Sequence, residues 1–298
     1  MRGLKMLARA LVMAAILGGP ATAQDLVEVA PGVMLNIVEA GEETAEPPLV
    51  LVPGWSMASG VWRTQIDHFS RSRRVIAIDP RSQGESTKTG YGNTPATRAR
   101  DLRAVLEARG VRRPVLVGWS QGVQDLAAYV TLYGTDDLAG LVLVDSAIAG
   151  GARSMTPENA EANTVTFVRM AIYQQYQAEY VQGFLEAIIT QPQPPERLER
   201  LAADAMKTPP AIGVAIMIAD LFGDDHSAAA DLIRRPTLIV ASDSSPELAR
   251  QRALAERIPG ARFEIVEDAG HALFVDQPER FNALLAEFLA ALPDEPEG

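Results

Sequence analysis

Short apolar runs alternate with amphipathic segments along most of the chain. The runs are four to six residues long and rich in Val, Ile and Leu, which is typical of buried strands. Strands are therefore expected at residues 26–29, 33–38, 49–52, 74–78, 114–117, 141–144, 237–241 and 262–266. The first two flank Pro31-Gly32 and predict a β-hairpin. Helical patterns lie at residues 61–69, 94–109, 121–133, 246–257 and 278–292.

Strands that alternate with helices predict a mainly parallel sheet covered by helices on both faces, which is the α/β class. Residues 146–235 break this alternation, because they carry helical patterns, divided by prolines into about four helices, and no convincing strand. An insertion after a sheet strand should lie above the carboxyl ends of the strands, where α/β sheets bind ligands. We therefore expect an α/β core at residues 24–145 and 236–298, with a helical cap at residues 146–235.

One motif in the core carries chemistry. The sequence Gly118-Trp119-Ser120-Gln121-Gly122 follows an apolar run directly and precedes a helical pattern. A strand, Gly-x-Ser-x-Gly and a helix form a nucleophile elbow, a strained turn that lifts the serine above the edge of the sheet. Glycines on both sides leave room where a Cβ would collide with a neighbouring strand or helix. The sequence therefore predicts Ser120 as a nucleophile.

Two further stretches give the chain a likeness to a known family. Pro53-Gly54-Trp55 follows a buried strand and resembles a His-Gly-x oxyanion loop. Asp79-Pro80-Arg81-Ser82-Gln83-Gly84-Glu85-Ser86 resembles the pattern Asp-x-Arg-Gly-x-Gly-x-Ser. Together with the elbow, these motifs make the chain similar to the α/β-hydrolase superfamily, in its small, cap-bearing branch of esterases and peroxidase-like enzymes. Trp55 combined with Gly118-Trp119-Ser120 is also similar to the pimeloyl-ACP methyl ester esterases.

The resemblance implies a serine hydrolase that uses no cofactor and no metal ion. It assigns the oxyanion hole to the backbone N–H groups of Trp55 and Gln121, and one such donor is typically worth about 3 kcal/mol in the transition state. Pro53 departs from the family pattern, in which a histidine side chain at this position helps to hold the loop. Ser120 argues against epoxide hydrolase and haloalkane dehalogenase chemistry, because both need a carboxylate nucleophile in the elbow.

A serine hydroxyl is too weakly acidic to attack an ester without a base, and the chain has three histidines that could serve. His68 lies on an expected surface helix, and His226 lies in a polar turn of the expected cap. His271 follows the last expected strand, in a loop that should emerge on the same side of the sheet as the elbow. The chain order serine, acid, histidine also matches this fold. We therefore assign His271 as the base.

The acid that orients this histidine has two candidates. Asp243 follows the strand expected at residues 237–241, which usually carries the acid in this fold, although the family's Gly-x-x-Asp is replaced here by Ala241-Ser242-Asp243. Asp145 ends the strand at residues 141–144, and some relatives use an acid at that position. We favour Asp243 because its strand re-enters the core after the insertion, and we keep Asp145 as the alternative.

The composition narrows the range of possible partners. The 298 residues are 47% hydrophobic and 22% charged, which suits one large globular domain. A formal charge of −11, with no basic run outside the N-terminus, disfavours nucleic acid and anionic membranes. The absence of cysteine excludes disulfides, thiolate metal sites, a cysteine nucleophile and a lipoprotein anchor. A small-molecule ester is the expected partner.

The first residues predict export. Three basic residues among the first nine precede an apolar run at residues 10–17, and Ala21-Thr22-Ala23 supplies a small-x-small cleavage site. The apolar run is too short to span a bilayer, which needs about 20 residues, so no stable membrane anchor is expected. We therefore predict a cleaved signal peptide at residues 1–23 and a mature chain that starts near Gln24, in the bacterial periplasm or secreted.

These features together predict an exported serine esterase that acts through an acyl-enzyme, with Ser120, His271 and Asp243 as its triad. Hydrolysis of a lactone or thioester, and cofactor-free perhydrolysis, need the same groups and remain alternatives. A non-catalytic binding protein on the same scaffold is the alternative from a different class. A fluorophosphonate, which reacts only with an activated serine, distinguishes that last alternative from an enzyme.

Overall fold

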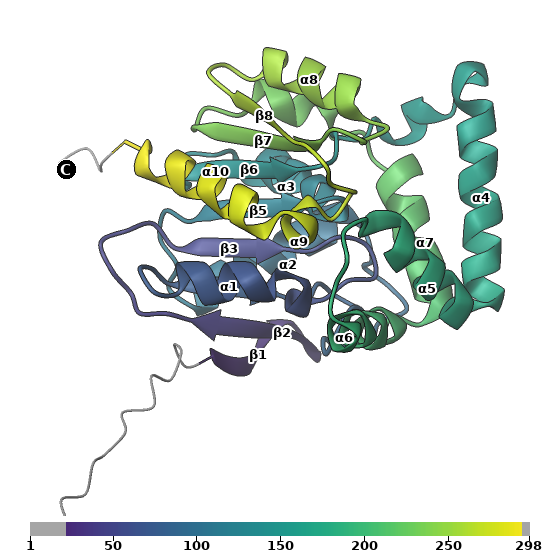
Figure 1. The fold of residues 1–298 in the computed structure, drawn as a ribbon, viewed down its shortest axis with the longest axis horizontal. Helices are drawn as coiled ribbons and strands as arrows, with labels where there is room; N and C mark the ends of the chain where they lie inside the picture. The colour runs from purple at the N-terminus through teal and green to yellow at the C-terminus, as the bar shows by residue number, and fades with distance from the viewer. Residues whose placement is uncertain (1–21, 294–298) are drawn as a thin grey trace, which may run out of the picture.

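The computed structural model describes residues 22–293, and their strands form one eight-stranded sheet (Figure 1). The strands are β1 (Thr22–Ala30), β2 (Val33–Ala40), β3 (Leu49–Val52), β4 (Val75–Ile78), β5 (Val115–Trp119), β6 (Gly140–Val144), β7 (Thr237–Ser242) and β8 (Arg262–Val266). Their order across the sheet is β1-β2-β4-β3-β5-β6-β7-β8. β2 is antiparallel to both β1 and β4, and all other neighbours are parallel. The predicted mainly parallel sheet is confirmed.

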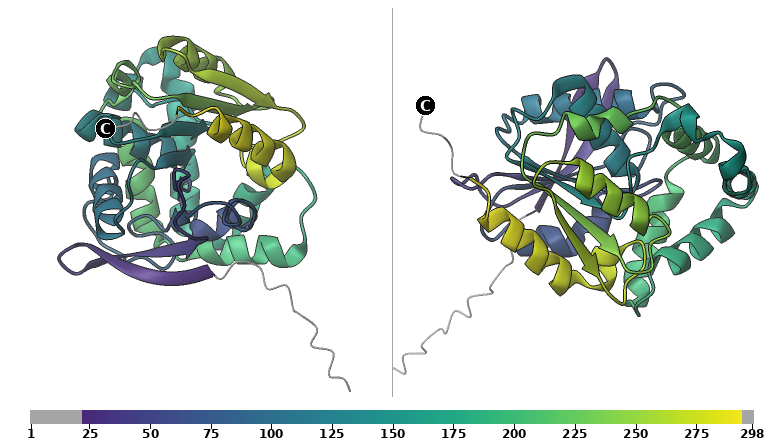
Figure 2. Two further views of the ribbon diagram at one scale, coloured as in Figure 1. Left: turned by 90° about the vertical axis from the view of Figure 1, so that its left-hand side faces the viewer. Right: turned by 90° about the horizontal axis from the view of Figure 1, so that it is seen from above.

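The central strands are apolar throughout because both faces of the sheet are buried. Side chains alternate between the two faces, so Leu49 and Leu51 join one core while Val50 and Val52 join the other. Helices α1 (Arg63–Phe69) and α10 (Pro278–Ala290) cover the first face. Helices α2 (Pro95–Ala108), α3 (Gln121–Tyr133) and α8 (Leu248–Arg257) cover the second (Figures 1 and 2). The helix expected at residues 61–69 begins at Arg63, and its first two expected positions belong to a 3-10 turn, η1 (Ser59–Trp62).

Between β6 and β7 the chain is helical. It holds α4 (Ala160–Gln175), α5 (Gln177–Ile188), α6 (Pro195–Met206) and α7 (Pro210–Phe222), with 3-10 turns η2 (Gly151–Ser154), η3 (Pro157–Asn159) and η4 (Ser227–Asp231). Pro195 and Pro210 stand at the first positions of α6 and α7, where a missing N–H costs nothing. We call residues 146–235 the helical insertion. Figure 1 shows its helices α4 to α7 gathered at one end of the sheet.

Two sequence expectations concern the N-terminal signal peptide and the absence of a membrane anchor. The expected signal peptide lies outside the described residues except for Thr22 and Ala23, which are the first residues of β1. Among residues 22–293, no single helix is long and apolar enough to cross a membrane. Only α6 and α7 taken together reach that length and composition, and they are bent by 85° relative to each other.

A buried ion cluster joins the helical insertion to the core. Arg98 on α2 donates to Asp125 on α3 at 2.8 Å and to Asp220 on α7 at 2.5 Å. All three side chains are at most 5% exposed. One guanidinium faces two carboxyl groups here, and burial raises the pKa of Asp125 to about 7 and that of Asp220 to about 6 against the opposing effect of Arg98. The cluster therefore has one more carboxyl group than it has cations, and burial favours the protonated form of that extra carboxyl group.

This surplus predicts a fall in stability as the pH rises. In the unfolded chain both carboxyls lose their protons near pH 4, whereas in the folded chain they hold them up to about pH 6 to 7. Between these limits the native state binds more protons, so their contribution to stability is present below about pH 4 and lost by about pH 7. Asp220→Asn removes one acid that must ionise while buried, so we expect its unfolding midpoint to decline less between pH 5 and pH 8.

Thermal unfolding at several pH values between 5 and 8 measures this difference. Asp67→Asn, which alters an exposed aspartate paired with Arg63 on α1, is the matched control and should follow the wild-type slope. Parallel pH dependences for the wild type and Asp220→Asn would contradict the role given to the cluster.

Candidate active site

Ser120 occupies a strained turn at the carboxyl end of β5. It lies between Trp119, the last residue of the strand, and Gln121, the first residue of α3. Its backbone angles are φ 55° and ψ −115°, a region that a residue with a side chain rarely adopts. A Cβ at Gly118 would lie 2.6 Å from the carbonyl oxygen of Gly122, and one at Gly122 would lie 2.5 Å from that of Val52. The expected elbow is therefore present, and both of its glycines are needed sterically.

The neighbouring strand places an acid beside the elbow. In the β5–β6 register Trp119 pairs with Val144, so Ser120 and Asp145 directly follow the ends of two adjacent strands. The Asp145 carboxylate is fully buried, and its Oδ2 lies 2.7 Å from Nδ1 of His271. Its Oδ1 accepts hydrogen bonds from the backbone N–H of Ser242 at 2.9 Å and from Nε2 of Gln251 at 3.2 Å. The carboxylate is thus held in one orientation, with one oxygen assigned to the imidazole.

The preference for Asp243 as the partner of His271 is wrong in this structure. The Asp243 side chain is exposed, and its Oδ2 accepts from the backbone N–H of Asp268 at 3.3 Å. The reason is the order of the strands, because β6 lies between β5 and β7 and is therefore closer to the elbow. The residue before Asp243, Ser242, supports Asp145 through its N–H. The alternative acid, Asp145, is the one that contacts the histidine.

His271 is placed next to the elbow by its own backbone. Its carbonyl oxygen accepts a hydrogen bond of 2.9 Å from Nε1 of Trp119, and the two rings lie 5.3 Å apart. A carboxylate can only accept, so Nδ1 carries the proton toward Asp145 and Nε2 keeps the lone pair that a base needs. The imidazole is 29% exposed and thus accessible to a substrate. No hydrogen bond joins the Ser120 hydroxyl to this ring within residues 22–293, and catalytic hydrogen bonds of this kind often tighten only in the complex with substrate.

The other two histidines lie away from this arrangement. His68 is exposed on α1 and packs edge-on against Phe69. His226 is buried just before η4 in the helical insertion, and burial lowers its pKa. Neither of them contacts Asp145 or Asp243 among the described residues, so only His271 combines an acid partner with a position beside the elbow.

Two backbone N–H groups are available to an oxyanion. Trp55 follows β3 and Gln121 begins α3, and neither N–H donates a hydrogen bond within the described part of the chain. The loop of Trp55 lies against the elbow, since a Cβ at Gly54 would be 3.1 Å from Cβ of Ser120. The N–H of Gln121 also belongs to the positive end of the α3 dipole, which favours negative charge. The expected donors thus belong to two loops that meet at the serine.

The Trp55 side chain packs rather than lining an open site. It is 4% exposed, donates from Nε1 to the carbonyl oxygen of Gly213 at 2.8 Å, and lies edge-on to three aromatic rings of the insertion. These rings are Tyr173, Tyr180 and Phe184, at 4.7, 6.0 and 5.6 Å between centroids. The loop that carries the N–H of Trp55, one of the two expected oxyanion donors, is therefore held by the helical insertion.

Several supporting residues carried no recognisable signal in the sequence. Gln251 on α8 and Ser242 at the end of β7 orient Asp145, although each belongs to an ordinary-looking helix or strand. Asp276, which accepts a hydrogen bond from the N–H of Gly270 next to His271, belongs to α9 (Leu273–Asp276), a helix too short to show a helical period. The position of Asp145 did carry a signal, since it directly follows the apolar run expected as a strand at residues 141–144.

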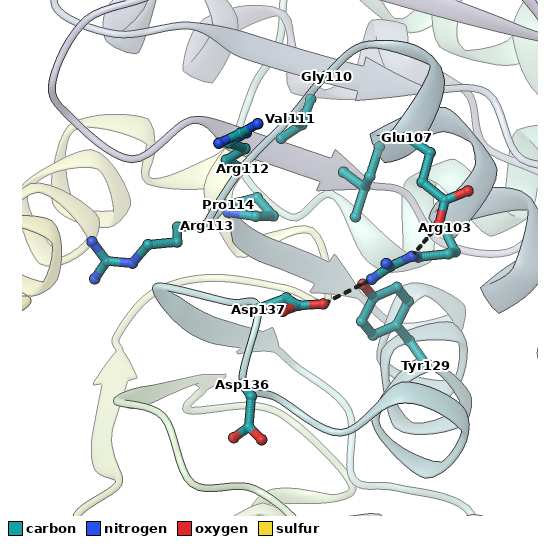
Figure 3. Close-up of a pocket in the computed structure, with 11 residues that line it drawn as sticks. Arg103, Glu107, Gly110, Val111, Arg112, Arg113, Pro114, Tyr129, Asp136 and Asp137 are labelled. Carbon is teal, nitrogen blue, oxygen red and sulfur yellow. Dashed lines mark hydrogen bonds and ion pairs between the residues drawn. The ribbon is translucent and has the colours of Figure 1, made fainter. Parts of the chain in front are cut away.

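Two cavities of the described structure are lined by none of Ser120, Asp145 and His271. One of 420 Å³ lies among Arg103, Glu107, Tyr129 and Asp137, with Arg103 bound to both acids (Figure 3). Its other lining residues precede β5 and β6, so it opens at the amino ends of the parallel strands, opposite to Ser120. A larger cleft of 770 Å³ lies between α5 and α6 of the insertion. Within residues 22–293, no group of three or more His, Asp or Glu side chains could hold a metal ion.

The chain is similar to enzymes of one family over most of its length. The model of the Alpha/beta hydrolase family matches residues 49–284. A non-heme chloroperoxidase of Kitasatospora aureofaciens is 28% identical over 256 residues, covering 81% of this chain and 92% of the chloroperoxidase. An esterase of Exiguobacterium antarcticum superposes with a TM-score of 0.79 at 21% identity, over 89% of this chain and 99% of the esterase. Est816, an N-acyl homoserine lactone degrading enzyme, superposes with a TM-score of 0.71 at 28% identity, over 89% of this chain and 100% of Est816.

Proposed function

The chain belongs to the alpha/beta hydrolase family, and on that basis we propose that it is an exported serine esterase that cleaves a carboxylic ester through an acyl-enzyme. Ser120 is the nucleophile, His271 is the base and Asp145 is the acid. The observation that carries the proposal is the 2.7 Å contact between His271 and the buried Asp145, at the strand end next to the strained Ser120. The helical insertion acts as a cap over this end of the sheet.

Acylation follows from the roles of these groups. Nε2 of His271 takes the proton of the Ser120 hydroxyl as the oxygen attacks the ester carbonyl. Asp145 stabilises the imidazolium that forms and keeps Nδ1 protonated throughout. The negative charge that develops on the carbonyl oxygen is bound by the N–H groups of Trp55 and Gln121. The imidazolium then protonates the leaving alcohol, and the acyl group remains on Ser120.

Deacylation uses the same groups with water in place of the serine. Nε2 of His271 takes a proton from the water, the resulting oxygen attacks the acyl carbonyl, and the oxyanion returns to the same two N–H groups. The imidazolium gives its proton back to the Ser120 oxygen as the acid product leaves. Every proton is therefore returned, and the cycle needs no cofactor.

Esters of graded acyl length test the proposed reaction. We expect p-nitrophenyl esters of short to long acids to be hydrolysed, with a burst of nitrophenol equal to the enzyme concentration wherever deacylation is slow. The acyl length with the highest kcat/KM then identifies the substrate class. A folded protein that hydrolyses none of these esters would contradict the proposal.

The relatives support a second candidate on the same triad. Est816 degrades N-acyl homoserine lactones, and the relative from Kitasatospora aureofaciens is a chloroperoxidase. A lactone would acylate Ser120 by ring opening, and hydrogen peroxide in place of water would release a peracid from the acyl-enzyme. Comparing kcat/KM for an acyl homoserine lactone with that for the open-chain ester, and assaying peracid with added peroxide, ranks these reactions against simple ester hydrolysis.

Export is a separate and testable part of the proposal. Cleavage after Ala23 would leave residues 24–30 of β1 to pair with β2, beginning with Gln24 opposite Val38. We expect protein recovered from the native host to start at or near Gln24, which intact-mass measurement shows directly. Soluble protein that retains Met1 would contradict the signal peptide and leave the proposed chemistry untouched.

A further inference from the structure

The loop that carries His271 is held by hydrogen bonds on both sides of the histidine. The carbonyl oxygen of Ala269 accepts hydrogen bonds from the hydroxyls of Ser242 and Ser244, at 2.5 and 2.8 Å. The N–H of Gly270 donates to Asp276 at 2.7 Å, and that of Ala272 donates to the carbonyl oxygen of Ile188 at 2.8 Å. The bonds to Ala269 come from the core, whereas Ile188 is the last residue of α5 in the helical insertion. The base is therefore supported from both parts of the protein.

Asp276 lies where these two supports meet. Asp276 as a whole residue is 7% exposed. Its carboxylate accepts hydrogen bonds from the backbone N–H groups of Gly270, Thr190 and Gln191 and from the Thr190 hydroxyl, at 2.7 to 3.1 Å. A buried carboxylate is acceptor-only, and here four donors satisfy it. One donor belongs to the residue before His271, and the other three belong to the insertion.

The segment that supplies these three donors packs directly on the histidine loop. We call residues 189–194, which join α5 to α6, the α5–α6 connector. A Cβ at Gly270 would lie 2.7 Å from the carbonyl oxygen of Ile188, so only glycine permits this approach. Gln191 adds a further bond from Nε2 to the carbonyl oxygen of Asp268, at 2.8 Å. The connector and the loop therefore form one hydrogen-bonded unit that is centred on Asp276.

We propose that Asp276 is a positioning residue for His271, and that it aligns the base by binding the histidine loop to the α5–α6 connector of the helical insertion. The proposal rests on the proposed serine esterase. The Asp276 carboxylate bonds to the backbone N–H of Gly270, whereas the imidazole of His271 bonds to Asp145, so Asp276 acts on the base through the backbone. The position of the helical insertion on the core and the alignment of His271 are then coupled, because the hydrogen bonds that fix both are made by the Asp276 carboxylate.

The expected effect of losing this carboxylate is on the chemical step. His271 must keep Nδ1 on Asp145 while Nε2 faces Ser120, and a displacement of about 1 Å can cost about 10²-fold in rate. Asp276→Asn keeps the size of the side chain but turns an NH₂ group toward donors that need an acceptor. We expect kcat for an ester to fall about 10²-fold with KM within about twofold of the wild type.

Two further variants separate positioning from general stability. Thr190→Val removes the hydroxyl donor on the connector side and should lower kcat in the same direction by a smaller factor. Lys207→Gln breaks an ion pair of 2.7 Å between the end of α6 and Glu85 of the core, away from the histidine loop, and should leave kcat unchanged. All variants are assayed well below their unfolding midpoints, and the rate of labelling by a small fluorophosphonate is measured beside kcat.

Equal falls in kcat and in labelling rate for Asp276→Asn, with KM retained, support the positioning role. Wild-type kcat and labelling in a folded Asp276→Asn, or a change in KM alone, overturn it. If Asp276→Asn does not fold, an unchanged kcat in Thr190→Val overturns it and a lowered kcat supports it. Failure of the wild-type protein itself to label at Ser120 would instead refute the proposed function, so the two failures are distinguishable.

Discussion

Ser120→Ala should abolish ester hydrolysis, with a fall in kcat of about 10⁵- to 10⁶-fold. The hydroxyl is the nucleophile of the proposed site, because the other elbow residues, Gly118, Trp119, Gln121 and Gly122, carry no group that could form an acyl-enzyme. Alanine keeps the Cβ of serine, so the backbone at φ 55° is no more strained than before. The hydroxyl makes no hydrogen bond within the described structure, and its loss should change the free energy of unfolding by less than about 0.5 kcal/mol.

Kinetics and thermal unfolding of the same preparation check this result. Ser146→Ala is a matched control, because Ser146 lies at the same edge of the sheet but bonds to Ala147 and Glu247 instead of taking part in the chemistry. It should retain wild-type kcat. More than a tenth of wild-type activity in a folded Ser120→Ala protein would show that Ser120 is not the nucleophile.

Asp145→Asn should lower kcat by about 10⁴-fold, whereas Asp243→Asn should change it by less than about twofold. The donors from Ser242 and Gln251 favour an oxygen where Oδ1 of Asp145 now lies, so the NH₂ group of the variant takes the place of Oδ2 and faces Nδ1 of His271. An NH₂ group can only donate, which forces the proton of the imidazole onto Nε2 and removes the lone pair that Ser120 needs. The Asp243 side chain is exposed and, among the described residues, accepts a hydrogen bond only from the backbone N–H of Asp268, so its replacement should leave the site unchanged.

Measurement of kcat for both variants, with folding checked by circular dichroism, decides between the two acids. The ranking matters more than either value, since each variant controls for the other as an aspartate-to-asparagine change after a sheet strand. A large fall in kcat for Asp243→Asn and a small one for Asp145→Asn would instead identify Asp243, which follows β7, as the acid.

The fold was predictable where the sequence pattern is local. The apolar run at residues 49–52 coincides with β3, because a strand buried on both faces needs continuous apolar residues. The strand expected at residues 262–266 coincides with β8, an edge strand in which Arg262 and Glu264 are mixed with apolar residues. The elbow was equally predictable, since Gly118 and Gly122 are sterically required on both sides of Ser120. The choice between two acids was not, because it depends on which strand lies beside β5, and strand order is a property of the whole sheet.

Contacts between the insertion and the core were also beyond local patterns. Arg98 and Asp220 are 122 positions apart, and Thr190 and Asp276 are 86 apart, yet each pair is in direct contact. Nothing in the composition around these residues marks them, because a buried charge looks like a surface charge until its partner is known. Such pairs fix how the insertion is seated over the strand ends, and so they shape the site without belonging to a motif.

The central claim is that Ser120 is activated by His271 and Asp145, and fluorophosphonate labelling followed by peptide mass spectrometry tests it most directly. The wild-type protein should gain one adduct, on the peptide that contains Ser120. Ser120→Ala should gain none, and Asp145→Asn should label far more slowly. A folded wild-type protein that gains no adduct, or gains it on another residue, would contradict the claim.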